Sequence, residues 1–439
     1  MATYVPITRE EEAEMLKACG LESMDGLYGD VPASVRLDSP LNLPKGMAEM
    51  AVRREMEALA GKNTVFPHVF RGAGAYRHLI PAIVDTVTGH ESFRTAYTPY
   101  QAEISQGVLQ SIFECQTDIC ELTGMEAANA SVYDGACAAA EACEMCRERK
   151  RGRVLVSESV DPKVLSVIRT YAFGRGEQVD LVPLCGGVTD PEALLPLLQP
   201  DVSCLVVQQP NFFGCIEDLD ALTRAVHESG ARIVAHCNPI ALGLLKTPGE
   251  CGVDIAVGEG QPLGIPLAFG GPYLGFMACT SKLMRRLPGR IVGETVDSEG
   301  SRAFVLTLQA REQHIRREKA SSNICSNEAL CAMRAAAYLA AMGPEGLHET
   351  ALQCASKAHY LQQALEKAGL APVYPDREFF HEFVTECPDA DKLLSSLRKE
   401  GILGGLPLAG NRMLWCATEM NTKEEMDQAA AIAREVTGA

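Results

Sequence analysis

The chain has 439 residues, which is too long for one small hydrophobic core and predicts two or three domains. Its formal net charge of −17 disfavours non-specific binding to nucleic acid or to anionic membranes. The first residues are charged where a signal peptide would be apolar, and the most apolar window, 264–279, is interrupted by prolines and glycines. The sequence therefore predicts no membrane span, and its seventeen cysteines without an export signal favour a reducing cytoplasm.

One pair of cysteines has the spacing of a metal or redox motif. Cys143 and Cys146 are separated by two residues, but they lie in an alanine-rich stretch that is typical of a helix, where positions i and i+3 share one face. No second pair at zinc spacing accompanies them. We therefore expect both thiols to pack as small apolar groups, and the sequence predicts no metal site.

Residues 1–63 resemble an arm rather than a domain. A capping box, Thr8 to Glu11, predicts a first helix. Residues 25–45 are rich in proline, glycine and aspartate and are expected to be extended, before a second helix over about 45–60.

Short apolar runs alternate with helix-period segments over residues 64–330. Strands are expected at 154–156, 179–184, 204–208, 232–235 and 254–257, and helices at 162–171, 191–198 and 218–229. This alternation predicts a large α/β domain with a mainly parallel sheet, in which ligands bind at the carboxyl ends of the strands.

The last segment, 331–439, has a different pattern. A long helix over about 327–368 is followed by a strand (379–385), a helix (389–400), a strand (413–417) and a helix capped by Thr422 and Glu425. This is a small α+β domain. The arm, the large domain and the small domain together indicate the α/β architecture of pyridoxal-phosphate (PLP) dependent transferases, fold type I.

Three groups surround PLP in that fold. A glycine-rich turn at a helix start holds the phosphate, a strand-ending carboxylate pairs with the pyridine nitrogen, and a lysine forms the Schiff base. Asp134-Gly135 leads into an alanine-rich helix and is either such an anion-binding turn or a tight turn of small residues. Asn238 follows strand 232–235 where the carboxylate is expected, and Gln261 or Pro262 stands about where the lysine belongs. We interpret these five positions as a degenerate PLP site.

Two other lysines leave an alternative open. Lys246 lies in a helix or loop before a strand, and Lys319 lies in a basic run far downstream, so neither is expected at a strand end. A chain without the lysine and the carboxylate is not expected to catalyse PLP chemistry alone. An autonomous PLP lyase or aminotransferase that uses Lys246 or Lys319 is the alternative.

Longer motifs identify a family. The sequence closely resembles the N-terminal, or alpha, subunits of glycine decarboxylase, the P-protein of the glycine cleavage system, over nearly the whole chain. The matching motifs are TAYTPYQ (95–101), EISQG (103–107), ANAS (128–131), YDG (133–135), DIAVG (254–258), FGGP (269–272), LTLQAREQHIRR (306–317) and SNI (322–324). One departure is visible, because Asn238-Pro239 stands where the alpha family often has Asp-Pro.

The resemblance implies a two-part enzyme. A beta subunit holds PLP covalently on its lysine, glycine loses CO2 there, and the aminomethyl group passes to the lipoyl arm of H-protein. The chain ends soon after its small domain, so we expect the beta half to be a separate polypeptide, and the family resemblance implies an alpha2beta2 assembly. A non-catalytic scaffold that only docks H-protein is a second alternative.

Because PLP sites of this fold form between subunits, the resemblance also suggests residues that this chain contributes. The first candidates are Tyr97, Thr98 and Tyr100 in the loop 95–101, whose alternative role is buried packing. The second is the basic run 311–319, in which Arg311 is expected on a different helix face from Arg316, and whose alternative is pairing with neighbouring acids. Ser322 and Asn323 follow it. His78, in RGAGAYRH, is the last candidate, and His236 is expected to be structural.

Overall fold

The computed structural model describes residues 6–37, 39–94, 98–309 and 312–439. The chain divides into two compact units, residues 1–65 and 66–439. No helix within the described ranges is long and apolar enough to cross a membrane.

Among its described residues the first unit contains two α-helices, neither of which has a buried residue. Helix α1 (Arg9–Ala18) begins with the expected capping box, in which the Glu11 N–H donates to Thr8 Oγ1 at 3.2 Å and the Thr8 N–H donates to Glu11 Oε2 at 2.7 Å. Helix α2 (Glu49–Ala60) starts four residues later than predicted. The segment between them was expected to be extended, but it contains two 3-10 turns, Met24–Tyr28 and Ala33–Val35.

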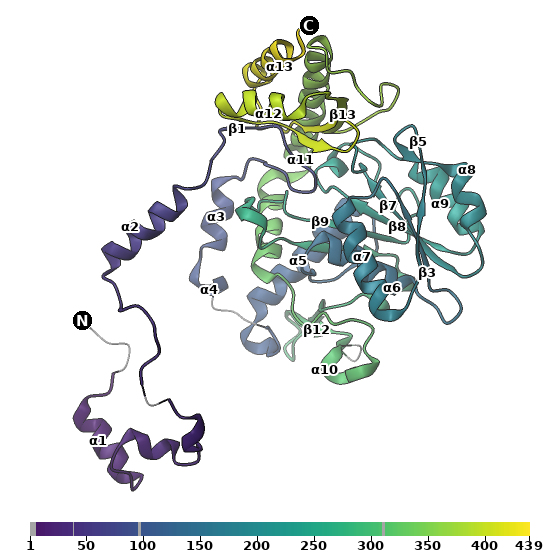
Figure 1. Cartoon of the computed structure of the whole chain (residues 1–439). Coiled ribbons are helices and arrows are strands. Elements are labelled where there is room, and N and C mark those ends of the chain that lie inside the picture. Colours follow the sequence, from purple (N-terminus) through teal and green to yellow (C-terminus); the bar gives the residue numbers. More distant parts are fainter. Residues whose placement is uncertain (1–5, 38, 95–97, 310–311) are drawn as a thin grey trace. The chain divides into compact units, whose positions relative to one another are not determined.

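A seven-stranded sheet forms the centre of the second unit (Figure 1). Its order is β2-β10-β9-β8-β7-β3-β4, and β10 is antiparallel to both neighbours while the pairs from β9 to β4 are parallel. The bounds are β2 (Ala127–Ala128), β3 (Arg153–Ser157), β4 (Val179–Val182), β7 (Val202–Gln209), β8 (Arg232–Cys237), β9 (Ile255–Glu259) and β10 (Gly275–Cys279). The prediction of a mainly parallel sheet is confirmed.

Helices cover both faces of this sheet. Alternate residues of a strand point to opposite faces, so Leu205 of β7 faces one core and Val206 faces the other. The first core is closed by α5 (Gln106–Thr123), α9 (Leu219–Glu228) and α11 (Ala329–Lys367), and the second by α6 (Gly135–Cys146) and α7 (Pro162–Arg175). Shorter helices are α3 (Ala82–Thr88), α4 (Glu91–Arg94) and α8 (Pro191–Leu194). Cys143 and Cys146 pack into the second core, as expected for structural thiols.

A smaller sheet lies toward the C-terminus. Strands β13 (Glu382–Glu386), β16 (Arg412–Cys416) and β15 (Leu406–Leu408) form it, and α12 (Ala390–Lys399) and α13 (Lys423–Thr437) pack beside it around the fully buried Trp415. Strand β1 (His68–Val69) pairs with β14 (Ile402–Leu403), so this early segment packs with the C-terminal core. The boundary at residue 330 stays a prediction, because the contacts separate only residues 1–65 from the rest.

Three local predictions were wrong in part. The first strand of the small sheet begins at Glu382 rather than 379, because Phe380 turns to donate its N–H to the Gly214 carbonyl at 3.2 Å. The long helix α11 is broken at Gly343, where φ is 61° and Pro344 follows. The basic run is no continuous helix: α10 (Gln313–Arg316) is one turn long, and a φ of 55° at Arg317 ends it.

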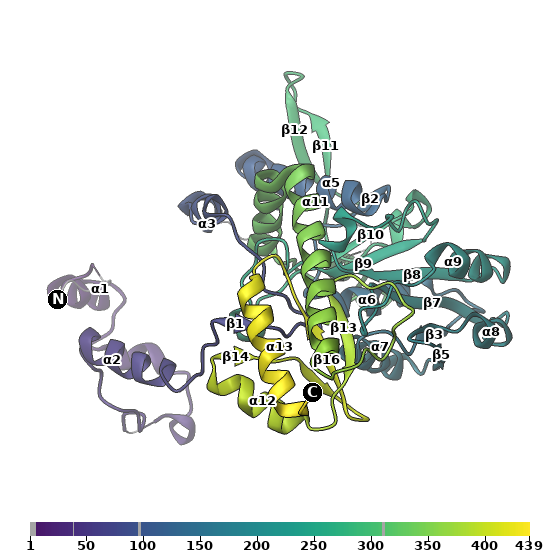
Figure 2. The same ribbon diagram turned by 90° about the horizontal axis from the view of Figure 1, so that it is seen from above.

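Two hairpins complete the second unit. Strands β5 (Leu184–Cys185) and β6 (Val188–Thr189) form a short one. Strands β11 (Ile291–Val296) and β12 (Arg302–Thr307) form a longer one, which projects beside α5 (Figure 2).

Candidate cofactor site

The five positions of the predicted degenerate site lie close to one another in the chain's fold. Asn238 follows β8, Gln261 and Pro262 follow β9, and Asp134 and Gly135 start α6, which packs on both strands. A cavity of about 30 Å³ lies among these strand ends, which is room for one or two water molecules. Its lining includes Tyr76, Asp161, Gln208, His236, Asn238, Glu259, Pro262, His381 and Glu382.

The amide at the start of α6 is already occupied by a carboxylate of the same chain. Asp134 caps the helix by accepting from the Cys137 N–H at 2.7 Å, and the Gly135 N–H donates to Glu259 Oε2 at 3.0 Å. The other oxygen, Glu259 Oε1, accepts from the Gln261 N–H at 3.0 Å and from the Leu274 N–H at 2.9 Å. The Glu259 carboxylate therefore occupies the position at the helix N-terminus where a phosphate would bind.

Opposing effects act on the Glu259 carboxyl. Burial raises its pKa to about 7, against the lowering effect of the three backbone donors. A Cβ atom at Gly135 would lie 2.7 Å from the Glu259 backbone nitrogen, so α6 approaches β9 as closely as only glycine permits.

Gln261 acts as a structural clamp. Its Oε1 accepts from the Tyr76 N–H at 2.9 Å, and its Nε2 donates to the carbonyl oxygens of Tyr76 at 2.9 Å and Ile265 at 2.8 Å. The side chain is 1% exposed. Pro262 beside it carries no amine, so neither position can form a Schiff base.

The residues at the end of β8 and directly after it offer no charge to a pyridine ring. Asn238 Oδ1 accepts from the Ile240 N–H at 2.9 Å, and its amide nitrogen lies 3.4 Å from His381 Nε2. Both ring nitrogens of His236 are buried and lack a hydrogen-bond partner within the described residues. Burial lowers the pKa of His236 to about 4, so its ring is neutral at pH 7.

PLP does not fit this site. The phosphate-binding amide is occupied, the amine and the ring carboxylate are absent, and the cavity is far smaller than the cofactor. The two alternative lysines do not compensate. Lys246 Nζ pairs with Asp220 at 2.8 Å on the surface, and Lys319 is exposed at the end of a 3-10 turn.

A second group surrounds a buried arginine, Arg290, which the sequence interpretation missed. Its guanidinium donates to Thr98 Oγ1 at 3.2 Å, to the Tyr100 hydroxyl at 3.4 Å and to Ser326 Oγ at 3.4 Å, and it lies 5.4 Å from the centre of the Tyr100 ring. Arg290 is 2% exposed, whereas Tyr100 is 54% exposed. The buried Arg290 therefore supports the exposed side chain of Tyr100.

The remaining candidates are scattered. The His314 ring lies 6.3 Å from the Tyr100 ring. Ser322 Oγ accepts from the Ile324 N–H at 3.0 Å, and Asn323 is exposed. Tyr97 and Arg311 lie outside the described residues.

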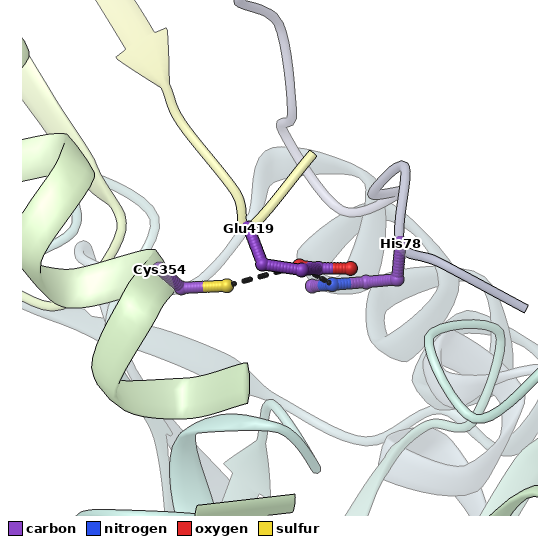
Figure 3. A group of neighbouring side chains, drawn as sticks. All are labelled: His78, Cys354 and Glu419. Atoms are coloured by element: carbon purple, nitrogen blue, oxygen red, sulfur yellow. Dashed lines mark hydrogen bonds and ion pairs between the residues drawn. The ribbon is translucent and has the colours of Figure 1, made fainter. Parts of the chain in front are cut away.

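His78 lies apart from the basic run, in a buried cluster (Figure 3). Its Nδ1 is 2.8 Å from Glu419 Oε2, and the Cys354 thiol donates to the same oxygen at 3.4 Å. Near it, Glu382 accepts from the Ala73 N–H and from the Tyr76 hydroxyl, each at 2.7 Å, and so fixes the loop that carries His78.

Comparison with known proteins places the chain in a family. The family model described as "Glycine cleavage system P-protein" matches residues 2–432. The chain belongs to this family. The "Probable glycine dehydrogenase (decarboxylating) subunit 1" of Moorella thermoacetica is 53% identical over 98% of this chain and 99% of its own length. The predicted family resemblance is confirmed.

Solved structures confirm the predicted fold type. A crystal structure of glycine decarboxylase (P-protein) of the glycine cleavage system, in inhibitor-bound form, superposes with a TM-score of 0.93 at 44% identity, covering 99% of this chain and 100% of that one. A sphingosine-1-phosphate lyase from Burkholderia pseudomallei superposes with a TM-score of 0.67 at 17% identity, covering 92% and 94%, which shows the fold alone. The P-protein chain therefore has the α/β fold of the fold type I PLP enzymes.

Proposed function

We propose that this chain is subunit 1, the alpha subunit, of glycine dehydrogenase (aminomethyl-transferring). With a beta partner it decarboxylates glycine, releases CO2 and transfers the aminomethyl group to the lipoyl arm of H-protein. The observation that carries the proposal is a chain that matches the P-protein family over residues 2–432 and whose own predicted cofactor position is filled by Glu259 and Gln261. Relatives named "subunit 1" support a second subunit.

PLP is assigned to the beta subunit. When bound there, the cofactor supplies the electron sink for decarboxylation. The absence of an amine at Pro262 and of an acid at Asn238 supports this division, because the cofactor's two defining partners must then come from elsewhere. The assembly is proposed as alpha2beta2, with glycine and lipoylated H-protein as the reacting partners.

The part of this chain that we assign to the shared active site is the loop 95–101 with its support. Arg290 orders Thr98 and Tyr100, so the exposed phenol is presented in one orientation toward a partner. Tyr97, Arg311, Ser322, Asn323 and His78 stay candidates for the same role. The first unit supports subunit contact, because its helices expose Met15, Met50, Met56 and Leu59.

Exchange between glycine and labelled CO2 tests the division of labour. The purified chain supplied with PLP is expected to show none, because it cannot bind the cofactor covalently. A mixture of this chain with its beta partner, PLP and lipoylated H-protein is expected to exchange label readily. If this chain alone exchanged the label, and borohydride reduction gave a pyridoxyl adduct on Lys246 or Lys319, the chain would be an autonomous PLP enzyme instead.

A pair of substitutions separates an active-site role from a scaffold. We expect Arg290→Met and Tyr100→Phe each to lower kcat/KM of the assembled complex, by about tenfold or more for Arg290→Met, because the loop loses its orientation. Tyr374→Phe, at a partly buried tyrosine outside this group, is the control and should leave the rate unchanged. Size-exclusion chromatography must show normal assembly. If both variants assemble normally and keep the wild-type kcat/KM, the result would support the alternative that this chain is a non-catalytic scaffold.

A further inference from the structure

Three potential metal ligands from distant parts of the chain meet at one buried point (Figure 3). His78 precedes α3, Cys354 lies on α11, and Glu419 follows β16. The atoms His78 Nδ1, Cys354 Sγ and Glu419 Oε2 lie within 4.8 Å of one another. The Cys354 side chain is fully buried, and the side chains of His78 and Glu419 are 2% and 14% exposed.

We propose that these three atoms bind one divalent transition metal ion, of the class of Zn²⁺ or Co²⁺. Imidazole, thiolate and carboxylate are the ligands that such ions take in proteins. Bond lengths of about 2.0–2.3 Å place the donor atoms of a tetrahedral site about 3.3–3.6 Å apart. The Cys354 Sγ to Glu419 Oε2 separation of 3.4 Å already fits, and the His78 Nδ1 to Glu419 Oε2 distance of 2.8 Å has to open by about 0.5 Å.

The charges of the site balance on binding. Without metal, burial and the Glu419 carboxylate keep the pKa of the Cys354 thiol raised, so the thiol is protonated. The ion displaces that proton to solvent and forms a metal–thiolate bond. The His78 proton moves from Nδ1 to Nε2, which is buried and has no partner within the described residues. A dication with one thiolate and one carboxylate is neutral, which a buried site requires.

A separate observation points into the same place. The Tyr338 hydroxyl is buried and has no hydrogen-bond partner in the described ranges, and the neighbouring Thr350 hydroxyl donates to the Gly346 carbonyl instead. Burial first, and then the Glu419 carboxylate, raise the pKa of Tyr338, so its side chain lies within electrostatic reach of the proposed ligands. Three protein ligands leave a fourth coordination position for a water or another ligand.

The other titratable groups around the cluster are compatible with a bound ion. Lys357, one turn along α11, keeps its Nζ on the Glu419 backbone carbonyl at 2.6 Å rather than on the carboxylate. His381 beside His78 is neutral, because burial lowers its pKa, and the Cys416 thiol is protonated, because burial raises its pKa. The bound ion would tie the loop before α3 to α11 and to the C-terminal sheet.

Titration of the purified full-length chain with Co²⁺ tests the site. One equivalent is expected to bind, with a thiolate-to-cobalt charge-transfer band in the near ultraviolet, and with release of about one proton per ion in calorimetry. Zn²⁺ should displace Co²⁺ and raise the melting temperature of the wild type. Cys354→Ser and His78→Gln are expected to remove the band, whereas Cys331→Ser, a buried cysteine elsewhere on α11, should keep it.

Two outcomes overturn the proposal. One is a wild-type chain that binds less than stoichiometric Co²⁺ or shows no thiolate band. The other is a band that persists in Cys354→Ser, which would place the metal on another cysteine. If Cys354→Ser does not fold, Glu419→Gln is used in its place, because an amide keeps the size of the carboxylate and removes its charge. Loss of stoichiometric Co²⁺ binding in Glu419→Gln supports the site, and retention of stoichiometric binding overturns it.

Discussion

Replacing Glu259 by alanine is expected to lower the free energy of unfolding by about 3 kcal/mol or more. The substitution leaves three backbone donors without their acceptor, those of Gly135, Gln261 and Leu274, and each unsatisfied buried donor costs about 1–3 kcal/mol. Water that enters the new space recovers part of this loss. Urea unfolding at constant pH measures the difference, and Glu366→Ala, an exposed glutamate on α11, is the control and should change little.

The same variant is expected to acquire an anion site that the wild type lacks. Once the carboxylate is gone, the Gly135 N–H at the start of α6 is free to bind inorganic phosphate, while the Cys137 N–H stays capped by Asp134. At a concentration of one hundred times Kd, phosphate should then stabilise Glu259→Ala by about 2.7 kcal/mol. Equal stabilisation of the wild type would show that Glu259 does not block the helix terminus, and no stabilisation of the variant would show that the terminus is no phosphate cradle.

The sequence located the strand ends and the helix start that carry the five positions of the predicted degenerate site, but not the contacts between them. Strand periodicity and the turn chemistry of Asp134-Gly135 were sufficient for this, because local patterns determine where strands end and helices begin. The partner of Gly135 is Glu259, 124 residues later, and no local pattern reports that contact. The sequence does contain one signal, because Glu259 is a lone acid two or three residues before the position where the lysine is expected.

Long-range packing also explains why the sequence did not reveal the role of Arg290 or the break in the basic run 311–319. Arg290 reads as an isolated basic residue, and its role depends on hydroxyl groups from residues 98, 100 and 326 that meet only in the folded chain. The basic run 311–319 has helical composition, yet Arg317 takes a left-handed conformation that composition does not reveal. By contrast, both capping boxes were confirmed, since a cap is a contact between residues three apart.

Replacing Glu382 by glutamine is expected to make the chain more stable than the wild type at pH 8, by at most about 3 kcal/mol. Burial raises the pKa of Glu382 from 4.5 to about 7, so the folded state binds more protons than the unfolded state between these values. The stabilising contribution of the protonated carboxyl is complete below pH 4.5 and is lost as the pH rises through about 7. Glutamine stays neutral throughout and still accepts from the Ala73 N–H.

Unfolding in urea at pH 5.5 and pH 8 measures this dependence, because the wild type should lose more stability between the two values than Glu382→Gln does. Some slope should remain in the variant, since burial also raises the pKa of Glu141 and of Glu259 to about 7. Glu366→Gln should retain the wild-type slope. A variant that is less stable than the wild type at both pH values, with the same slope, would mean that Glu382 is a structural acceptor that does not titrate. The loop carrying Tyr76 and His78 would then be held equally well on both sides of neutrality.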